Sequence, residues 1–304
     1  MAVAAASAIA ALAMPSTVRA QSDGAGEEDA EAARRELEAS LRYQAGAIQL
    51  PCGKAELALP DGYRYLGAED TDRVLQMWGN PPSPSTEGMI IPPGSSVIEA
   101  DGWAVVLEYT DDGHVDDADA ASIDYDALLA QMKRAAADHN RERTRLGLAT
   151  ADLVGWAEPP HYDQVSKKLY WAKDLLFSGE DEHTLNYAVR ILGREGVLEL
   201  NAVARVRDLA TVKPAMNEML AFSDFTAGNR YADYQPGVDR DAGYGVATLV
   251  AGGAVATKIV TSKGFWAVLL AAKKFLIVIA LAIAGLFKVL WSRLRGAGSS
   301  ADHA

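Results

Sequence analysis

Cysteine and basic residues are scarce in this chain of 304 residues. Its one cysteine, Cys52, excludes an internal disulfide, and a single thiolate without partner ligands does not form a metal site. We interpret Cys52 as a small, buried side chain. Lys and Arg number 29 against 41 Asp and Glu, which gives a net charge of -12. Because nucleic-acid binding needs cations clustered on one face, this acidic balance predicts no nucleic-acid partner.

The sequence also lacks the short motifs that mark common enzyme classes. It contains no Gly-x-Ser-x-Gly, no His-Glu-x-x-His, no phosphate loop and no dinucleotide-binding fingerprint. No recognised pair of nucleophile and base is visible, and we predict no cofactor.

The N-terminus has the pattern of a signal peptide. Residues 2–14 are an alanine-rich apolar run, too short to span about 30 Å of hydrocarbon as a helix. Val18 and Ala20 place short side chains where signal peptidase needs them, although no basic residue precedes the run. We predict that residues 1–20 are removed by cleavage after Ala20. The alternative is a soluble alanine-rich helix. Residues 21–45 then form an acidic linker or surface helix.

A second apolar run lies near the C-terminus. It extends from Phe275 to Trp291, contains the single charge of Lys288, and would be about 26 Å long as a helix. The run is apolar on all sides, which favours a membrane span over a helix in the interface, although a buried core helix is the alternative. We predict one transmembrane helix within residues 265–292 as the contact with the membrane.

The two ends together predict a topology. Removal of a signal peptide leaves the body outside the cytoplasm, and the apolar helix then stops transfer. We expect a single-pass protein of the bacterial inner membrane, with its body in the periplasm. Residues 236–264 would be a membrane-proximal segment, and 293–304 a short basic cytoplasmic tail. Within the former, residues 246–260 could form a second span or a periplasmic helix.

The body, residues 46–235, has the pattern of an α+β fold. The Asp61-Gly62 pair has the composition of a hairpin turn. The order strand, helix, strands, helix predicts an antiparallel sheet with helices packed on it. We expect strands at residues 103–109, 152–157, 168–177, 184–192 and 197–206, and helices at 124–147 and 209–222.

Several spaced motifs resemble one bacterial family. They lie at residues 78–82, 113–120, 154–163, 169–173, 185–194 and 228–234. Together they are similar to the DUF2167 family, whose members are described as predicted membrane-anchored proteins. The similarity runs from about Gly46 to about Gly245, with the apolar tail beyond it. The family carries no activity, so the resemblance implies a topology but no catalytic residues.

An acidic loop at residues 111–119 is the first candidate site. His114 lies there among several carboxylates, and alternating oxygen ligands suit Ca²⁺. The spacing departs from the calcium-binding EF-hand, however, because Gly113 comes too early. We favour turn and capping chemistry, with Asp124 as a helix N-cap, and expect an exposed loop. The candidate residues of this loop are His114, Asp116, Asp117 and Asp119.

Two further groups of polar residues are candidates. His161 and Asp163 follow a Pro-Pro turn, where a histidine near a carboxylate could do acid–base work or simply lie on the surface. Asn186 and Arg190 lie on one face of a predicted strand, and could line a pocket together with Lys173 and Arg194. The alternative is a solvated face of the sheet.

Two functions remain open. We favour a non-enzymatic module that binds an extracytoplasmic protein or another envelope component, because no familiar catalytic set is visible. The alternative is a periplasmic hydrolase with an atypical Asp/His site, formed by the acidic loop with His114 or His161.

Overall fold

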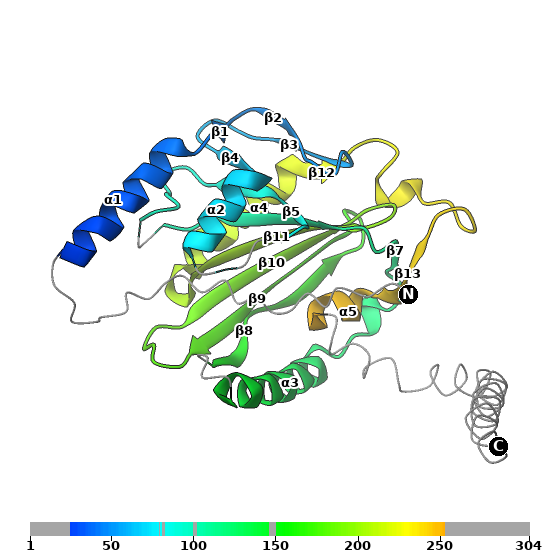
Figure 1. The fold of residues 1–304 in the computed structure, drawn as a ribbon. Helices are drawn as coiled ribbons and strands as arrows, with labels where there is room; N and C mark the ends of the chain where they lie inside the picture. The colour runs from blue at the N-terminus through cyan, green and yellow to red at the C-terminus, as the bar shows by residue number, and fades with distance from the viewer. Residues whose placement is uncertain (1–24, 79, 81–82, 100–101, 146–149, 253–304) are drawn as a thin grey trace, which may run out of the picture. The chain divides into compact units, whose positions relative to one another are not determined.

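The computed structural model describes residues 25–78, 80, 83–99, 102–145 and 150–252 (Figure 1). The predicted signal peptide, the predicted transmembrane helix at 265–292 and the basic tail lie outside these residues. Within the described part of the chain, no helix combines the length and apolar character that a membrane crossing needs. Anchoring through the run from Phe275 to Trp291 therefore stays a prediction.

An eight-stranded antiparallel sheet organises the fold. Four of its strands, which follow one another in the sequence, are also neighbours in space, so this half of the sheet is a simple meander. The large antiparallel sheet and the packed helices confirm the predicted α+β class. In spatial order the strands are β1 (Tyr43–Gln44), β4 (Arg64–Gly67), β5 (Thr86–Ile91), β6 (Val105–Thr110), β11 (Val197–Arg205), β10 (Thr184–Leu192), β9 (Lys168–Phe177) and β8 (Ala151–Asp163).

Two smaller sheets complete the strand inventory of the described residues. One is antiparallel, and the other is a parallel pair. The first contains β12 (Ser223–Phe225), β3 (Ala55–Ala58) and β2 (Ala47–Gln49), and the second contains β13 (Asp241–Gly245) and β7 (His114–Asp116).

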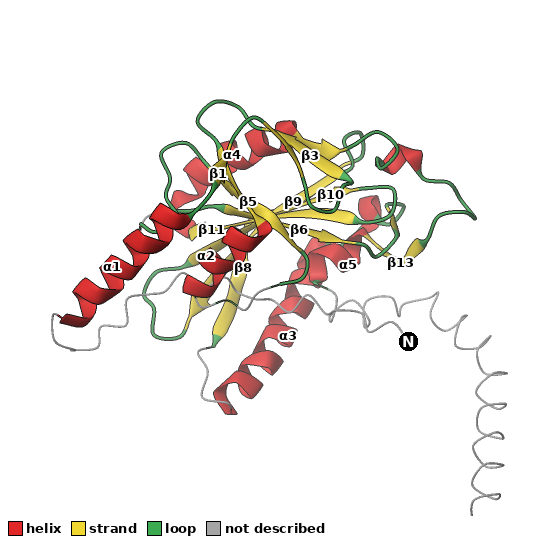
Figure 2. Cartoon of the chain, turned by 45° about the horizontal axis from the view of Figure 1, so that its top comes forward, coloured by secondary structure: helices red, strands yellow, loops and turns green. Residues whose placement is uncertain are grey.

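Helices cover both faces of the large sheet (Figure 2). On one face, α4 and the three-stranded sheet bury Val212, Met216 and Met219 against the central strands. On the other face, α2 packs Val74 and Leu75 over β4, β5 and β6. The helices are α1 (Ala25–Ser40), α2 (Ala68–Met77), α3 (Tyr125–Arg145), α4 (Leu209–Phe222) and α5 (Val246–Ala251), with short 3-10 turns at Ala120–Ser122, Val206–Asp208 and Tyr231–Asp233.

The long helix α3 lies along β8, at the edge of the sheet (Figure 1). The indole of Trp156 donates to the Tyr125 carbonyl over 3.4 Å, and the Asn140 amide donates to the Ala151 carbonyl over 3.0 Å. Asp124 caps this helix as predicted, because its carboxylate accepts the Ala127 N–H at 2.9 Å. These contacts fix one wall of the sheet face that carries Lys173 and Asn186.

Alternation explains why the central strands form. In β10, Leu185, Tyr187 and Val189 are buried on the α4 side, whereas Asn186 and Arg190 point to the opposite face. The predicted ranges 168–177, 184–192 and 209–222 coincide with β9, β10 and α4. A repeating pattern over nine or ten residues was sufficient here.

Three local expectations differ from the structure. The turn expected at Pro159 and Pro160 does not form, because both residues lie within the continuous strand β8. Asp61-Gly62 joins two strands, as expected, but these do not pair: β3 joins the small sheet and β4 the large one. The acidic loop is also not wholly exposed, because His114–Asp116 forms β7 beside β13, and His114 and Val115 are buried. β7 is buried because it pairs with β13, a segment far away in the sequence. The Asp-rich composition of the loop gives no sign of this burial.

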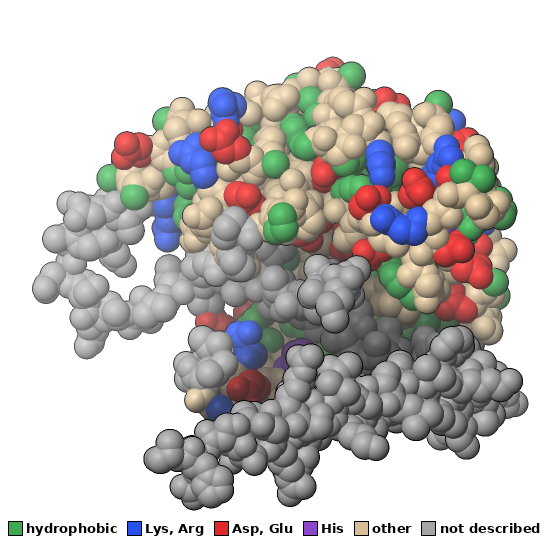
Figure 3. All heavy atoms as spheres, turned by 45° about the vertical axis from the view of Figure 1, so that its right-hand side comes forward, with side chains coloured by type: hydrophobic (Ala, Val, Ile, Leu, Met, Phe, Trp, Pro, Cys, Tyr) green, Lys and Arg blue, Asp and Glu red, His purple; other side chains and the backbone are tan. Residues whose placement is uncertain are grey.

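The folded body extends past residue 235. β13 and α5 continue it, and Val246, Val250 and Ala251 are buried. Residues 246–251 of the 246–260 segment thus form a short helix on the body, while residues 253–260 lie outside the described residues. On the face drawn in Figure 3, Lys and Arg side chains lie beside Asp and Glu side chains.

Candidate functional site

The contacts of Asp117 hold the β7–β13 region together. Its Oδ2 accepts hydrogen bonds from the Tyr162 hydroxyl and the Lys167 ammonium, each at 2.6 Å, and its Oδ1 accepts one from the Tyr231 hydroxyl at 3.0 Å. Burial alone raises the pKa of Asp117, but the bonds from Lys167 and Tyr162 outweigh it and hold that pKa below its usual value. The carboxylate therefore stays ionised as an acceptor between three chain segments.

His114 is packed rather than free. Its ring stacks on Tyr234 at 3.7 Å between centroids and lies against Tyr231 at 4.3 Å. Its Nδ1 is 3.1 Å from the Arg194 carbonyl, so this nitrogen donates. Arg194 in turn makes a bidentate pair with Asp239, with both N–O distances at 2.7 Å. The imidazole is thus one layer of an aromatic stack.

The remaining acidic residues of the loop also have partners. Asp116 accepts the Ala118 N–H at 2.9 Å, and Asp119 accepts the Val246 N–H at 2.9 Å and the Ala247 N–H at 3.2 Å. Among the described residues, no group of three or more His, Cys, Asp or Glu side chains is arranged to hold a metal ion. We call β7, β13 and the side chains of Asp117, Asp119, His114, Tyr231 and Tyr234 the clasp.

Gly113 explains the approach of the two clasp strands. Its φ is +103°, and a Cβ at this position would lie 2.6 Å from the Arg240 carbonyl oxygen. Only glycine fits such a conformation so close to another backbone. The early glycine that departs from the EF-hand pattern thus serves strand packing.

His161 and Asp163 have separate surroundings. The His161 ring packs on Tyr170 at 5.0 Å, and Asp163 accepts hydrogen bonds from the Ser166 hydroxyl at 2.7 Å and the Val165 N–H at 2.8 Å. The Ser166 bond is the main cause of a lowered pKa at Asp163. The structure brings Tyr162 to the clasp, but gives His161 and His114 different neighbours.

Three members of the third group, Lys173, Asn186 and Arg190, converge on the sheet face opposite α4, whereas Arg194 pairs with Asp239 instead. Lys173 lies directly opposite Asn186 in the β9–β10 ladder, and Arg190 lies opposite Glu199 in the β10–β11 ladder. Arg190 Nη2 is 2.7 Å from Glu199 Oε2, and its Nη1 donates to Asn201 Oδ1 at 3.3 Å. Burial raises the pKa of Glu199, against the effect of Arg190. Asn186 and Arg190 therefore share a face, as alternation predicts.

Lys173 is the unusual member of this face. Its side chain is only 8% exposed, and burial, assisted by repulsion from Arg190, lowers its pKa to about 8. Its Nζ lies 5.9 Å from the Trp171 ring centroid, and the Arg190 guanidinium carbon lies 5.2 Å from the same centroid. Within the described part of the chain, Lys173 makes no hydrogen bond or ion pair.

Two neighbouring side chains with N–H donors also lack a hydrogen-bond acceptor among the described residues. The Nε1 of Trp171 is buried and has no acceptor in the structure. Asn186, which is half-buried, forms no side-chain hydrogen bond with any described residue. We call Trp171, Lys173 and Asn186 the donor cluster. Buried polar groups normally have partners, so this cluster is the strongest candidate for a ligand site.

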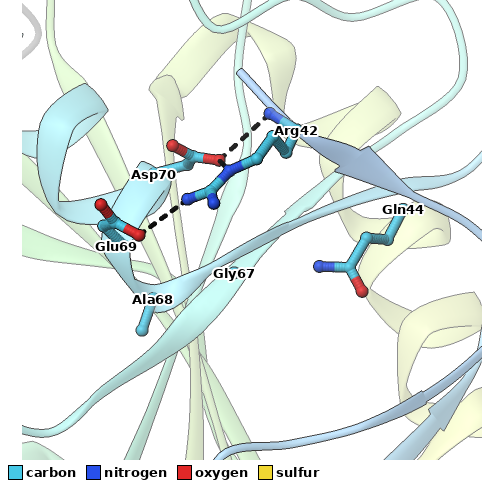
Figure 4. Close-up of a pocket in the computed structure, with 6 residues that line it drawn as sticks. All are labelled: Arg42, Gln44, Gly67, Ala68, Glu69 and Asp70. Carbon is cyan, nitrogen blue, oxygen red and sulfur yellow. Dashed lines mark hydrogen bonds and ion pairs between the residues drawn. The ribbon is translucent and has the colours of Figure 1, made fainter. Parts of the chain in front are cut away.

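A separate surface hollow of about 360 Å³ lies where the chain enters β1, beside the start of α2 (Figure 4). Arg42 crosses it, with Nη2 2.7 Å from Glu69 and Nε 3.0 Å from Asp70. Asp70 also pairs with Arg73 at 3.1 Å. The charges of these side chains neutralise one another. Their ion pairs connect the N-terminal segment to α2, so we assign this hollow a structural role.

Sequence reasoning missed several residues that the structure brings together. Trp171 and Glu199 were not candidates, nor were Tyr162 and Tyr231, which both donate to Asp117. Cys52 is half-buried, and burial is the first cause that raises the pKa of its thiol, in keeping with a structural side chain. Glu199 could have been found, because a hairpin at residues 193–196 places it opposite Arg190.

Comparisons with known proteins give a family and two distant structural likenesses. No curated protein matches significantly. The solution structure of the cyanobacterial PsbP protein CyanoP from Synechocystis sp. PCC 6803 is 12% identical and has a TM-score of 0.34; the match covers 62% of this chain and 94% of that one. The Ran-binding protein Mog1p of Saccharomyces cerevisiae is 9% identical, with a TM-score of 0.33 and coverage of 64% and 100%. Neither likeness is close enough to carry an argument about this chain.

The family match is far more extensive. The family described as protein of unknown function (DUF2167) matches residues 42–284, which include every strand of the large sheet and both the clasp and the donor cluster. This range also agrees with the motifs that resemble the family in the sequence. The chain belongs to the DUF2167 family.

Proposed function

We propose that this protein is a membrane-anchored, extracytoplasmic binding module whose ligand site is the sheet face at the donor cluster. The observation that carries the proposal is Lys173, which is only 8% exposed and makes no hydrogen bond or ion pair among the described residues, beside the buried Trp171 Nε1, which has no acceptor there. A buried polar group without a partner costs about 1–3 kcal/mol. A ligand acceptor would recover that free energy.

The position of the cluster favours binding by a preformed site. Lys173 and Trp171 lie on β9, which is hydrogen-bonded to β8 on one side and β10 on the other. Side chains on central strands are held more precisely than side chains on loops. A site of this kind selects its ligand without a large rearrangement.

The alternative, a hydrolase that uses the acidic loop, has less support. A general base needs a free carboxylate or imidazole within reach of its substrate. Asp117 is instead an acceptor for three structural donors, and the His114 ring stacks on Tyr234 with its Nδ1 at the Arg194 carbonyl. Activity at this loop would require these contacts to break.

The metal content of the purified full-length chain tests the choice between these functions. We expect less than stoichiometric divalent metal, with the same value in Asp117→Asn. A stoichiometric ion that is lost in Asp117→Asn, and retained in the exposed-site control Asp61→Asn, would instead favour the hydrolase.

The anchoring part of the proposal rests on the sequence. The run from Phe275 to Trp291 is long enough for a span, and Val18 and Ala20 fit a signal-peptidase site. We expect the mature chain to begin at Gln21. N-terminal sequencing of membrane-extracted protein checks this, and a chain that keeps residues 2–14 would contradict export by this route.

Carbonate washing of membranes tests the anchor itself. A chain that ends at Lys263 should be released from the pellet, because it lacks the apolar run. Asp at Ile279 and Ile283 should also release the full-length chain, since each adds about 2.5–3.5 kcal/mol to insertion near a helix centre. Leu at the same two positions is the matched control and should stay in the pellet. Retention of the truncated chain would indicate a second anchor in residues 246–260.

A further inference from the structure

The donor cluster has a specific chemical character. It offers an ammonium from Lys173, an indole N–H from Trp171 and an amide from Asn186. Lys173 and Asn186 are directly opposite each other, so their Cβ atoms are about 5 Å apart. Trp171 is two residues from Lys173 on the same face of β9, and its ring centroid lies 5.9 Å from Nζ. Lys173 and Asn186 can therefore donate to one acceptor group between them, with the Trp171 ring beside it.

The local charges define the acceptor. Arg190 is already compensated by Glu199 at 2.7 Å, and Glu108, across the ladder from Glu199, accepts the hydroxyls of Ser83 and Ser85. Lys173 is therefore the one cation of this face without a carboxylate partner in the described residues. A single negative charge would balance it. A dianion would bury an excess charge, which is costly in a site of low polarity.

On the side away from the Arg190–Glu199 pair, buried apolar residues border the cluster. Ala188 lies opposite Trp171 in the ladder, and Val203 lies opposite Asn186. Both are buried, and with the face of the Trp171 indole they form a small hydrophobic wall. Asn186 is only half-buried, so the cluster opens to solvent on its side. An acceptor that enters there would carry an apolar group against this wall.

We propose that Trp171, Lys173 and Asn186 form a site for a single carboxylate group carried on a small apolar body. The carboxylate accepts from the Lys173 ammonium and from the Asn186 amide on the open side, and the Trp171 ring packs beside it. The inference rests on the proposed binding function, and it names the ligand class of that same site.

The indole N–H resonance of Trp171 reports directly on this site. In the full-length chain, Trp171→Phe identifies the resonance by its loss, and the retained ring keeps the packing. We expect acetate to shift this resonance saturably at constant ionic strength, with sodium chloride as the reference. Butyrate should bind up to about tenfold more tightly, because its two added methylenes enter the apolar wall. Inorganic phosphate should bind more weakly than either.

Two lysine variants complete the test. Lys173→Met should weaken acetate binding at least about tenfold, since it removes the cation of the donor cluster while preserving side-chain length. Lys133→Met, at an exposed position on α3, is the matched control and should leave binding unchanged.

Three results would overturn the proposal: no saturable shift with either carboxylate, equal shifts with chloride, or tighter binding of phosphate. The readout is independent of anchoring and of metal content. Release of the wild-type chain by carbonate, or a stoichiometric metal, would therefore count against the proposed function while leaving the carboxylate site standing.

Discussion

The clasp and the donor cluster are built from the same kinds of residue and differ in how their polar groups are satisfied. In the clasp, Asp117 accepts three hydrogen bonds and Asp119 accepts two backbone N–H groups. In the donor cluster, Lys173 and Trp171 have no acceptors among the described residues. A closed network holds segments together, whereas an open one is available to a ligand.

This difference reverses the expectation from composition. The acidic loop is the more conspicuous feature of the sequence, yet its charges serve to fix β7 and α5 against the body. The less conspicuous β9 carries the buried, uncompensated cation. Substitutions in the clasp should therefore destabilise the fold, and a substitution at Lys173 should not.

The largest loss of stability is expected from Asp117→Ala. It leaves Lys167, Tyr162 and Tyr231 without their shared acceptor, and should cost about 2–3 kcal/mol of unfolding free energy. Because the folded-state pKa of Asp117 is lowered from 3.8, its stabilisation is present above that pH and is lost as the pH falls through the folded-state pKa. Urea unfolding at pH 7 and pH 3 measures both effects. Asp61→Asn is the control, and an equal loss in that variant would refute the comparison.

An effect of similar size but opposite sign is expected at Lys173. Its pKa is about 8 in the folded protein and 10.5 ordinarily, so the unfolded chain binds more protons between these values and stability rises with pH there. Lys173→Met should be more stable than wild type at pH 7. Its advantage should shrink by about 2–3 kcal/mol between pH 7 and pH 10.

The difference between the two chains isolates this effect from the tyrosines, which titrate near pH 10 in the unfolded state of both chains. A constant difference across this pH range would show that Lys173 is not held as a buried cation.

A smaller loss is expected from Asp119→Ala. It removes the acceptor of the Val246 and Ala247 N–H groups, and a lost N-terminal cap costs about 1 kcal/mol. The matched variant is Asp124→Ala, which removes the cap of α3. Amide hydrogen exchange should accelerate in β7 and β13 only for Asp119→Ala. Equal acceleration in both variants would mean that Asp119 does not act locally.

The smallest effect is expected at the surface hollow. Glu69 is 79% exposed and Arg42 is 68% exposed, so Glu69→Gln should leave the unfolding midpoint unchanged. Asp70 is 3% exposed and accepts from Arg42 and Arg73, so Asp70→Asn should lower the midpoint measurably. If the two variants behave alike, burial does not control the strength of these ion pairs.

The elements that sequence reasoning located are the long, regular ones. β9, β10 and α4 have the predicted bounds, and α3 lies within two residues of its prediction at both ends. Each element buries one face over several repeats of the apolar pattern, so the local sequence indicates which side chains are buried. The short strands β7, β12 and β13 give no such signal. Three to five residues carry too few repeats, and their partners lie far away in the sequence.

The candidate site also combines features that follow from the sequence pattern with one that does not. The common face of Asn186 and Arg190 follows from strand alternation, and the Arg190–Glu199 pair follows from the hairpin register. The isolation of Lys173 follows from neither. It depends on which side chains the fold places around Nζ, and on the fact that Glu199 is already engaged by Arg190.

The sequence by itself determined the α+β class, the family, the predicted export and anchoring segments, and the faces of the long strands. These properties depend on local periodicity and composition, which are present before folding. The tertiary structure decided which charged side chains have partners and which do not. Hydrogen-bond partners and burial arise between segments far apart in the chain, so only the folded arrangement shows that Asp117 is satisfied and Lys173 is not.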